Sequence, residues 1–196
     1  FTGTVDPVIY EGSLYPDTYF YTYATPRVDL ISRMQNKMQI TLAEAWSSRK
    51  ANLPYKTPHE ALIMASIIEK EAATKADRQL VAAVLVNRMK LGMRLQSDPT
   101  VRYGIDFEID RPISKADLRR KTPWNTYVIY GLPKTPICNP GFVSIEAALH
   151  PADSDHLYFV SDGFGGLRFA KTLDVHNKNV RSFRAIEAQN PKGPKP

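Results

Sequence analysis

The residues best suited to chemistry lie within residues 60–104, where an acidic side chain interrupts an apolar helical pattern and a polar loop follows. Ser66, Ala65 and Leu62 precede Glu69 by three, four and seven residues, and in a helix this spacing puts the Glu69 carboxyl on their face. Burial disfavours the charged carboxylate and raises its pKa, which suits an acid that works near neutral pH. We therefore predict that Glu69 is a general acid in a cleft.

A second carboxylate, Glu71, follows two residues later. It would point about 200° away from Glu69, at roughly 100° per residue. We therefore predict that Glu71 faces solvent or supports the site from behind, and does not share a site with Glu69. A structural alternative stays open for Glu69, because a buried Glu is often paired with an arginine, here Arg78 or Arg88.

Local signals predict the helices that would position Glu69. Thr57-Pro58, with Glu60 completing a capping box, predicts a helix start. A second helix is predicted from Asp77 to a C-terminal cap at Gly92. Apolar periodicity predicts a long helix over about residues 26–50 and shorter ones over 144–150 and 173–189.

The remaining pattern is typical of loops and a hairpin. Residues 93–141 read as Pro and Gly turns around short β-prone runs, whereas residues 156–172 alternate aromatic and aliphatic positions around a Gly-rich turn. We therefore predict an α+β fold in which the helical hairpin carrying Glu69 packs against a mainly antiparallel sheet, with N- and C-terminal helices. Residues 1–190 would form one domain, and residues 191–196 a tail.

Composition limits the function classes. Twenty-six Lys and Arg against twenty Asp and Glu give a formal charge of +6, which favours an anionic partner. The basic residues are scattered and no nucleic-acid-binding motif is present, so we expect no nucleic-acid partner. The four histidines lack metal-ligand spacing, and phosphate-binding glycine loops are missing. We therefore expect neither a metal nor a cofactor.

Seven segments then occur in one order: EGSLYPDTY, ASIIEKEA, VNRMKLGMRLQSDPTVRYG, TPWNTY, GLPKTPICNPG, LYFVSDG and HNKNV. Together they resemble the endolytic murein transglycosylases of the YceG/MltG type, over about residues 11–184. The resemblance implies that Glu69, in the SIIEKE segment, is the catalytic acid. It also implies a bacterial inner-membrane protein whose lytic domain is periplasmic. We interpret the chain as a fragment, with the membrane anchor expected only in the full-length protein.

The implied partners are peptidoglycan glycan strands, with work on nascent strands beside peptidoglycan synthases (penicillin-binding proteins). The implied reaction cleaves the β-1,4 bond between N-acetylmuramic acid and N-acetylglucosamine. Glu69 would protonate the glycosidic oxygen, and its carboxylate would then take the proton of the muramic acid C6 hydroxyl as that oxygen attacks C1. The product is a 1,6-anhydro end, so one carboxylate suffices.

Two alternatives from other classes stay open. A muramidase-type hydrolase would use a second carboxylate about 5 to 9 Å from the first. Asp98 is the best candidate for it, followed by Glu11 and Asp17, although Ser97-Asp98-Pro99 also fits a turn capped by Asp. The other alternative is a non-catalytic glycan-binding scaffold. Amide, hydroxyl and aromatic side chains in the loops suit sugar binding, and the predicted substrate-binding residues are Gln96, Asp98, Tyr103, Asn125, Thr126 and Tyr127.

Overall fold

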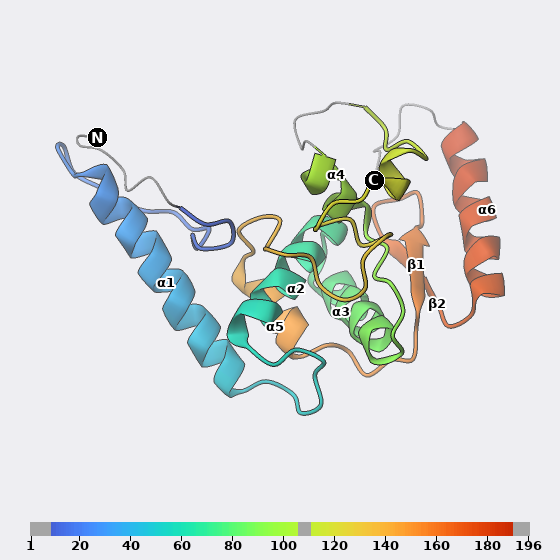
Figure 1. The fold of residues 1–196 in the computed structure, drawn as a ribbon, viewed down its shortest axis with the longest axis horizontal. Coiled ribbons are helices and arrows are strands. Elements are labelled where there is room, and N and C mark those ends of the chain that lie inside the picture. The colour runs from blue at the N-terminus through green and yellow to red at the C-terminus, as the bar shows by residue number, and fades with distance from the viewer. Residues whose placement is uncertain (1–8, 106–110, 190–196) are drawn as a thin grey trace.

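The computed structural model describes residues 9–105 and 111–189 (Figure 1). The elements are α1 (Arg27–Ser47), α2 (Pro58–Glu71), α3 (Lys75–Lys90), α4 (Asp98–Ile105), the 3-10 helix η1 (Asp117–Arg119), α5 (Phe142–Leu149), β1 (Tyr158–Ser161), β2 (Leu167–Ala170) and α6 (Leu173–Gln189). The strands pair antiparallel, with Tyr158 opposite Ala170. The predicted α+β class is confirmed, whereas the proposed tail lies outside the described residues.

The core forms around α2. Residues 61–68 of this helix are all buried, as expected of a helix that is apolar on every side. Its main partners are α5 and α3, while α3 also touches β1. In the described part of the chain the sheet has two strands, so the helical hairpin packs mainly on another helix and reaches the sheet through α3.

Short-range signals explain where α2 and α3 begin. The Thr57 hydroxyl accepts a hydrogen bond from the Glu60 N–H at 3.2 Å, as predicted. For α3 the cap is Thr74, whose hydroxyl accepts from the Asp77 N–H at 3.1 Å. The helix therefore starts two residues before the predicted Asp77, whose carboxylate accepts a hydrogen bond from the Thr74 hydroxyl at 2.8 Å. At its end Gly92 has a φ of +66°, the left-handed conformation that glycine adopts without strain.

The prediction of loops throughout residues 93–141 was wrong at α4. Asp98 and Pro99 open this helix, and an acidic residue followed by proline is a favourable start for a helix as well as for a turn. Burial of Thr100 and Val101 against the body of the protein decides between the two.

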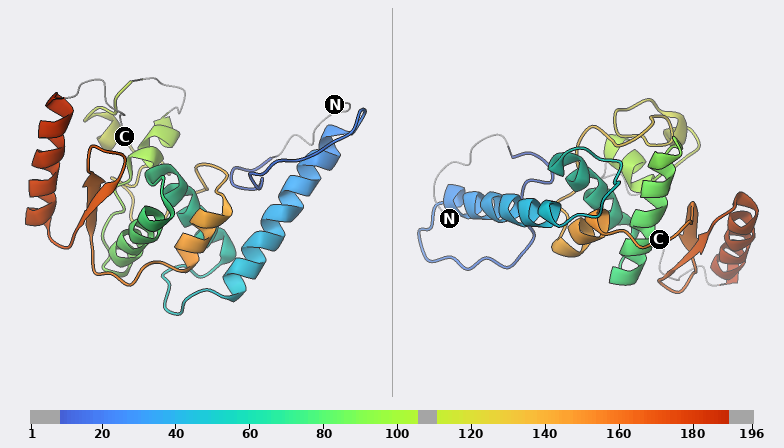
Figure 2. Two further views of the ribbon diagram at one scale, coloured as in Figure 1. Left: turned by 180° about the vertical axis from the view of Figure 1, so that it is seen from behind. Right: turned by 90° about the horizontal axis from the view of Figure 1, so that it is seen from below.

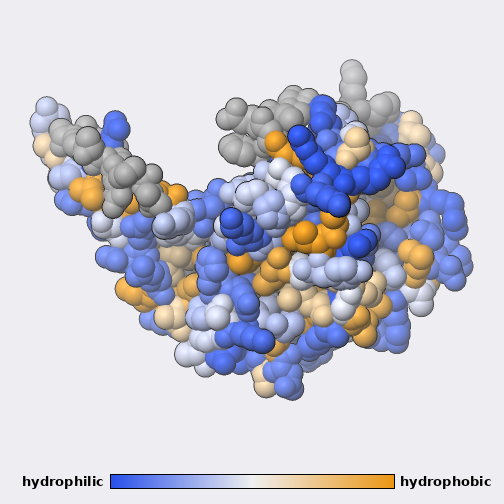
Figure 3. Space-filling model, viewed as in Figure 1, coloured by the Kyte–Doolittle hydropathy of each residue, from blue (hydrophilic) through white to orange (hydrophobic). Residues whose placement is uncertain are grey.

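Residues 9–47 form an arm that leaves the body on one side (Figures 1 and 2). Of the residues in α1, Met38 is the buried one, and the helix contacts the body through α5 and α2. The segment before α1 runs along it, with the Tyr15 N–H donating to the Met34 carbonyl at 3.1 Å. The face between arm and body is concave (Figure 3). On the far side of the body, α6 covers the hairpin of β1 and β2.

Candidate active site

Glu69 lies near the C-terminal end of α2, where three donors surround its carboxylate. Arg78, from α3, donates to Oε1 at 2.9 Å and to Oε2 at 3.1 Å. The N–H of Gly141, the residue that caps the start of α5, donates to Oε2 at 3.1 Å. An arginine fork and a helix N-terminus both stabilise negative charge. The geometry therefore suits the carboxylate form of Glu69, whose side chain is 25 % exposed.

Arg78 is itself held in place. Its Nε donates to the Ala72 carbonyl at 2.9 Å, and one terminal nitrogen also donates to the Ser144 hydroxyl at 3.0 Å. The arginine thus joins α2, α3 and α5 around the Glu69 carboxylate. The structure shows Glu69 paired with Arg78, which is the alternative that the sequence had left open. The expectation of an acid surrounded by apolar side chains was wrong.

Glu69 also lies where the arm joins the body. The Cβ position at Gly141 is 3.8 Å from Glu69 Oε2 and 3.9 Å from Pro16 Cγ. Pro16 belongs to the segment that runs back along α1, so parts of the chain far apart in sequence meet beside the carboxylate. A larger residue at position 141 would enter this narrow space.

Glu71 is half-buried and does not point freely into solvent, so the solvent-facing half of that prediction was wrong, whereas a supporting role behind the site stays a prediction. Its Oε1 accepts a hydrogen bond from the Ser97 hydroxyl at 2.5 Å. Burial raises the pKa of Glu71 to about 7, a rise that the Ser97 bond opposes and the nearby Asp98 carboxylate supports. The chain thus returns to the end of α2 through Ser97 and covers Glu71 there.

The segment at Ser97 is joined to a second loop through Thr126. The Ser97 N–H donates to the Thr126 hydroxyl at 2.9 Å, and the Gln96 N–H donates to the Thr126 carbonyl at 3.1 Å. On the exposed side of the same junction, the Tyr127 hydroxyl donates to Asp98 Oδ1 at 2.5 Å. The structure thus brings together four of the predicted binding residues: Gln96, Asp98, Thr126 and Tyr127.

Two of the predicted binding residues are enclosed by the protein. Asn125 is 1 % exposed and Thr126 is 0 % exposed. The Asn125 amide donates to three backbone carbonyls, those of Asp117, Leu118 and Arg120, at 2.8 to 3.3 Å. These side chains support the loop from inside. Gln96 and Asp98 are exposed and Tyr127 is half-buried, so these three can reach a ligand directly.

Tyr103 lies in a separate aromatic cluster. Its ring meets Trp124 edge-on, with centroids 5.6 Å apart, and the Trp124 indole N–H donates to the Thr135 hydroxyl at 2.8 Å. Glu11, one of the candidate second carboxylates, lies beside Tyr103. Asp17, the other, forms an ion pair with Lys37 on the arm. Within residues 9–105 and 111–189, the Asp98 carboxylate accepts its hydrogen bond from Tyr127 and not from a backbone N–H that it would cap.

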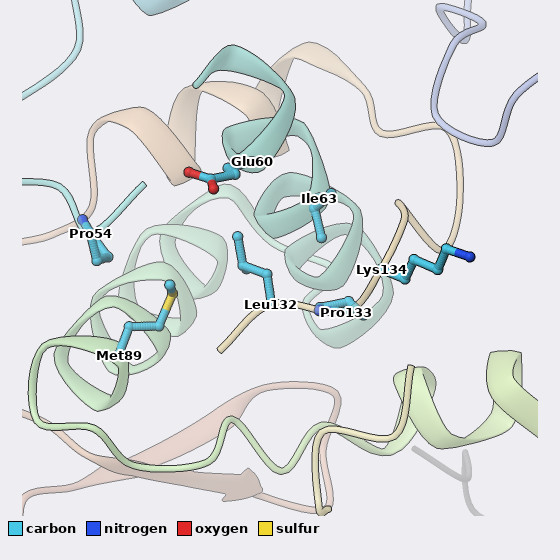
Figure 4. Close-up of a pocket in the computed structure, with 7 residues that line it drawn as sticks. All are labelled: Pro54, Glu60, Ile63, Met89, Leu132, Pro133 and Lys134. Atoms are coloured by element: carbon cyan, nitrogen blue, oxygen red, sulfur yellow. The ribbon is translucent and has the colours of Figure 1, made fainter. Parts of the chain in front are cut away.

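A hollow of about 350 Å³ lies at the opposite end of α2 (Figure 4). Glu60 and Ile63 contribute to it from α2, Met89 from α3, and residues 132–134 from a loop. Glu60 precedes Glu69 by nine residues, which is about 13 Å along a helix axis. The hollow is therefore distinct from the Glu69 site. In the described ranges, no group of three or more His, Cys, Asp or Glu is placed to hold a metal, and no helix is long and apolar enough to cross a bilayer.

Comparisons of the sequence and of the fold with known proteins lead to one protein family. The model of the YceG-like family matches residues 3–182. The endolytic murein transglycosylase of Bacillus subtilis is 42% identical over 183 residues, covering 93% of this chain and 49% of that protein. The protein of the same name from Streptococcus pneumoniae D39 is 35% identical over 177 residues, covering 87% and 31%.

A crystal structure of a YceG-like protein from Listeria monocytogenes superposes with a TM-score of 0.72 at 39% identity, covering 85% of this chain and 53% of that one. The chain thus spans about half the length, or less, of the relatives that it matches. A family match over most of the chain, together with a shared fold at this identity, leaves one assignment: the chain belongs to the YceG-like family.

Proposed function

We propose that this chain is the catalytic part of an endolytic murein transglycosylase that acts on peptidoglycan glycan strands. It cleaves the bond between N-acetylmuramic acid and N-acetylglucosamine and leaves 1,6-anhydro ends. The observation that carries the proposal is the placement of Glu69 at the junction of arm and body, with its carboxylate oriented by Arg78 and Gly141. The names of the relatives support the substrate class.

In this reaction Glu69 works twice. It first gives a proton to the glycosidic oxygen while the bond from that oxygen to C1 breaks. The carboxylate then accepts the proton of the C6 hydroxyl as that oxygen bonds to C1, so Glu69 ends the cycle protonated and no water is consumed. The donors seen on Glu69 stabilise the carboxylate that exists between the two halves. For the first half, a bound strand has to exclude water and replace part of the Arg78 contact, because desolvation favours the neutral acid.

The strand would lie along the concave face between arm and body (Figure 3). Gln96, Asp98 and Tyr127 would contact it directly, with Tyr103 at the aromatic cluster, while Asn125 and Thr126 hold the loop that carries Tyr127. We also infer that the full-length protein works on nascent strands at the outer, periplasmic side of the bacterial inner membrane, beside peptidoglycan synthases. The family resemblance and the excess of positive charge support this placement.

The test compares the wild-type chain with Glu69→Gln on purified glycan strands, with products identified by mass spectrometry. The expected products carry 1,6-anhydromuramic acid. The amide cannot donate the required proton, so the rate should fall by about 10² to 10⁴. Glu44→Gln is a matched control, because Glu44 is exposed on α1, and it should keep the wild-type rate.

The same digestion in ¹⁸O-labelled water separates the alternatives. Label in most of the new ends would identify a hydrolase. Binding of strands without cleavage by the wild-type chain would identify a scaffold. A Glu69→Gln variant that kept more than about a tenth of the wild-type rate would remove Glu69 from the role of acid, since the expected loss is at least about 10².

A further inference from the structure

Glu71 lies at a junction of three segments that are far apart in the sequence. It ends α2, it bonds to Ser97 just before α4, and Ser97 bonds in turn to Thr126 in the loop that carries Tyr127. Thr100 adds a second connection between α4 and this loop, with its hydroxyl 2.8 Å from that of Thr126. A change at Glu71 is therefore transmitted directly to the loops that display Asp98 and Tyr127.

The charges around Glu71 make this junction sensitive to ionisation. Asp98, at the start of α4, is the neighbouring carboxylate, and Tyr127 donates its hydroxyl to it. Arg88, from α3, is the neighbouring cation, but its guanidinium is engaged with the carbonyls of Leu157 and Leu95, both at 2.7 Å. Arg88 lowers the pKa of Glu71 less than Asp98 raises it, so an ionised Glu71 would be repelled by Asp98 more than it is attracted by Arg88.

The backbone next to Asp98, on which this repulsion would act, is tightly anchored. Ser97 is buried, and Gln96 has a φ of +53°, a conformation that a residue other than glycine keeps only when its surroundings enforce it. The backbone at residues 96–97 is thus held by its contacts with Thr126 and Glu71. Weakening one of these contacts would release strain at Gln96 and displace the side chains next to it.

We propose that Glu71 is a positioning residue for glycan binding: it holds Ser97, through Ser97 it keeps Asp98 and Tyr127 in the arrangement that receives the strand, and its ionisation disturbs that arrangement by repelling Asp98. This inference rests on the proposed function. Burial raises the pKa of Glu71 to about 7, so the neutral form is present at neutral pH and is lost as the pH rises further. Strand binding should therefore weaken on the alkaline side.

The experiment measures KM and kcat for strand cleavage between pH 5.5 and 9 in the wild type, Glu71→Gln and Glu71→Ala. In the wild type, KM should rise by about fivefold or more across pH 7, the size of an ordinary coupling between sites. Glutamine is neutral at every pH and its carbonyl can still accept from Ser97, so this rise should disappear in Glu71→Gln. Alanine gives Ser97 no acceptor, so KM should be high at every pH.

Two results would overturn the inference. One is an equal pH dependence of KM in the wild type and Glu71→Gln. The other is a loss of kcat at every pH in a folded Glu71→Gln variant, which would make Glu71 a proton donor. Glu44→Gln again serves as the control for a lost surface charge.

A binding measurement keeps the inference separate from the proposed function. If the wild type did not cleave strands, the proposed function would fail. The inference would then be tested by binding alone: the strand affinity of Glu69→Gln is compared with that of the double variant Glu69→Gln/Glu71→Gln over the same pH range. Affinity lost above pH 7 in the single variant alone would support the inference. Equal profiles, or no binding by either variant, would overturn it.

Discussion

The stability of the protein should depend on pH through Glu71, and Glu71→Gln isolates that dependence. Burial raises the pKa of this carboxyl from 4.5 to about 7 in the folded state. Each unit corresponds to about 1.4 kcal/mol, so the upper bound on the effect is about 3 kcal/mol. Part of the Glu71 side chain remains exposed, and solvent screening should reduce the effect to about 1 to 3 kcal/mol.

The sign follows from proton binding. Below about pH 4.5 both the folded and the unfolded chain carry the Glu71 proton, and the wild type has its full stability. Between pH 4.5 and about 7 the unfolded chain ionises first, so the wild-type free energy of unfolding falls as the pH rises and levels off above the folded pKa. Glutamine does not titrate. The advantage of Glu71→Gln over the wild type should therefore be largest above pH 7 and vanish toward pH 4.5.

Urea unfolding of both proteins between pH 4.5 and 8.5 measures this difference. With a slope of about 2 kcal/mol per molar urea, 1 to 3 kcal/mol corresponds to a midpoint shift of about 0.5 to 1.5 M. A difference that stayed constant with pH would show that hydrogen bonding and not ionisation separates the two proteins. A Glu71→Gln variant less stable than the wild type at pH 8 would show that Glu71 is ionised and favourably paired, and the reasoning from burial would be refuted.

Two further stability changes follow from the contacts of the site. Glu69→Gln should lower the free energy of unfolding at pH 7 by about 1 to 2 kcal/mol, because Arg78 loses a charged partner. Urea unfolding measures this, and a variant more stable than the wild type would contradict the paired geometry. Asn125→Ala should cost about 2 to 4 kcal/mol, because the buried Asn125 amide gives up its hydrogen bonds to three backbone carbonyls, of which that of Asp117 is buried. Thermal unfolding checks this, and a cost under about 0.5 kcal/mol, typical of surface changes, would argue against it.

The sequence alone determined the features that depend on near neighbours. Thr57 and Gly92 mark ends of helices because a cap needs only the hydroxyl, amide or glycine conformation within three or four residues. The apolar run from Ala61 to Ile68 predicts burial on its own. Glu69 stands out by its place at the end of that run, and the family resemblance assigns the same residue.

Tertiary structure decided what surrounds each carboxyl. Helical spacing separated Glu69 from Glu71 correctly, but it could not show that Arg78 and Gly141 meet Glu69 or that Ser97, 26 residues beyond Glu71, returns to cover it. Desolvation and hydrogen bonding depend on whatever the folded chain brings alongside, and those partners lie outside the short range over which sequence periodicity carries information. For the same reason, Asn125 resembles a surface amide in sequence and lies inside the protein in the structure.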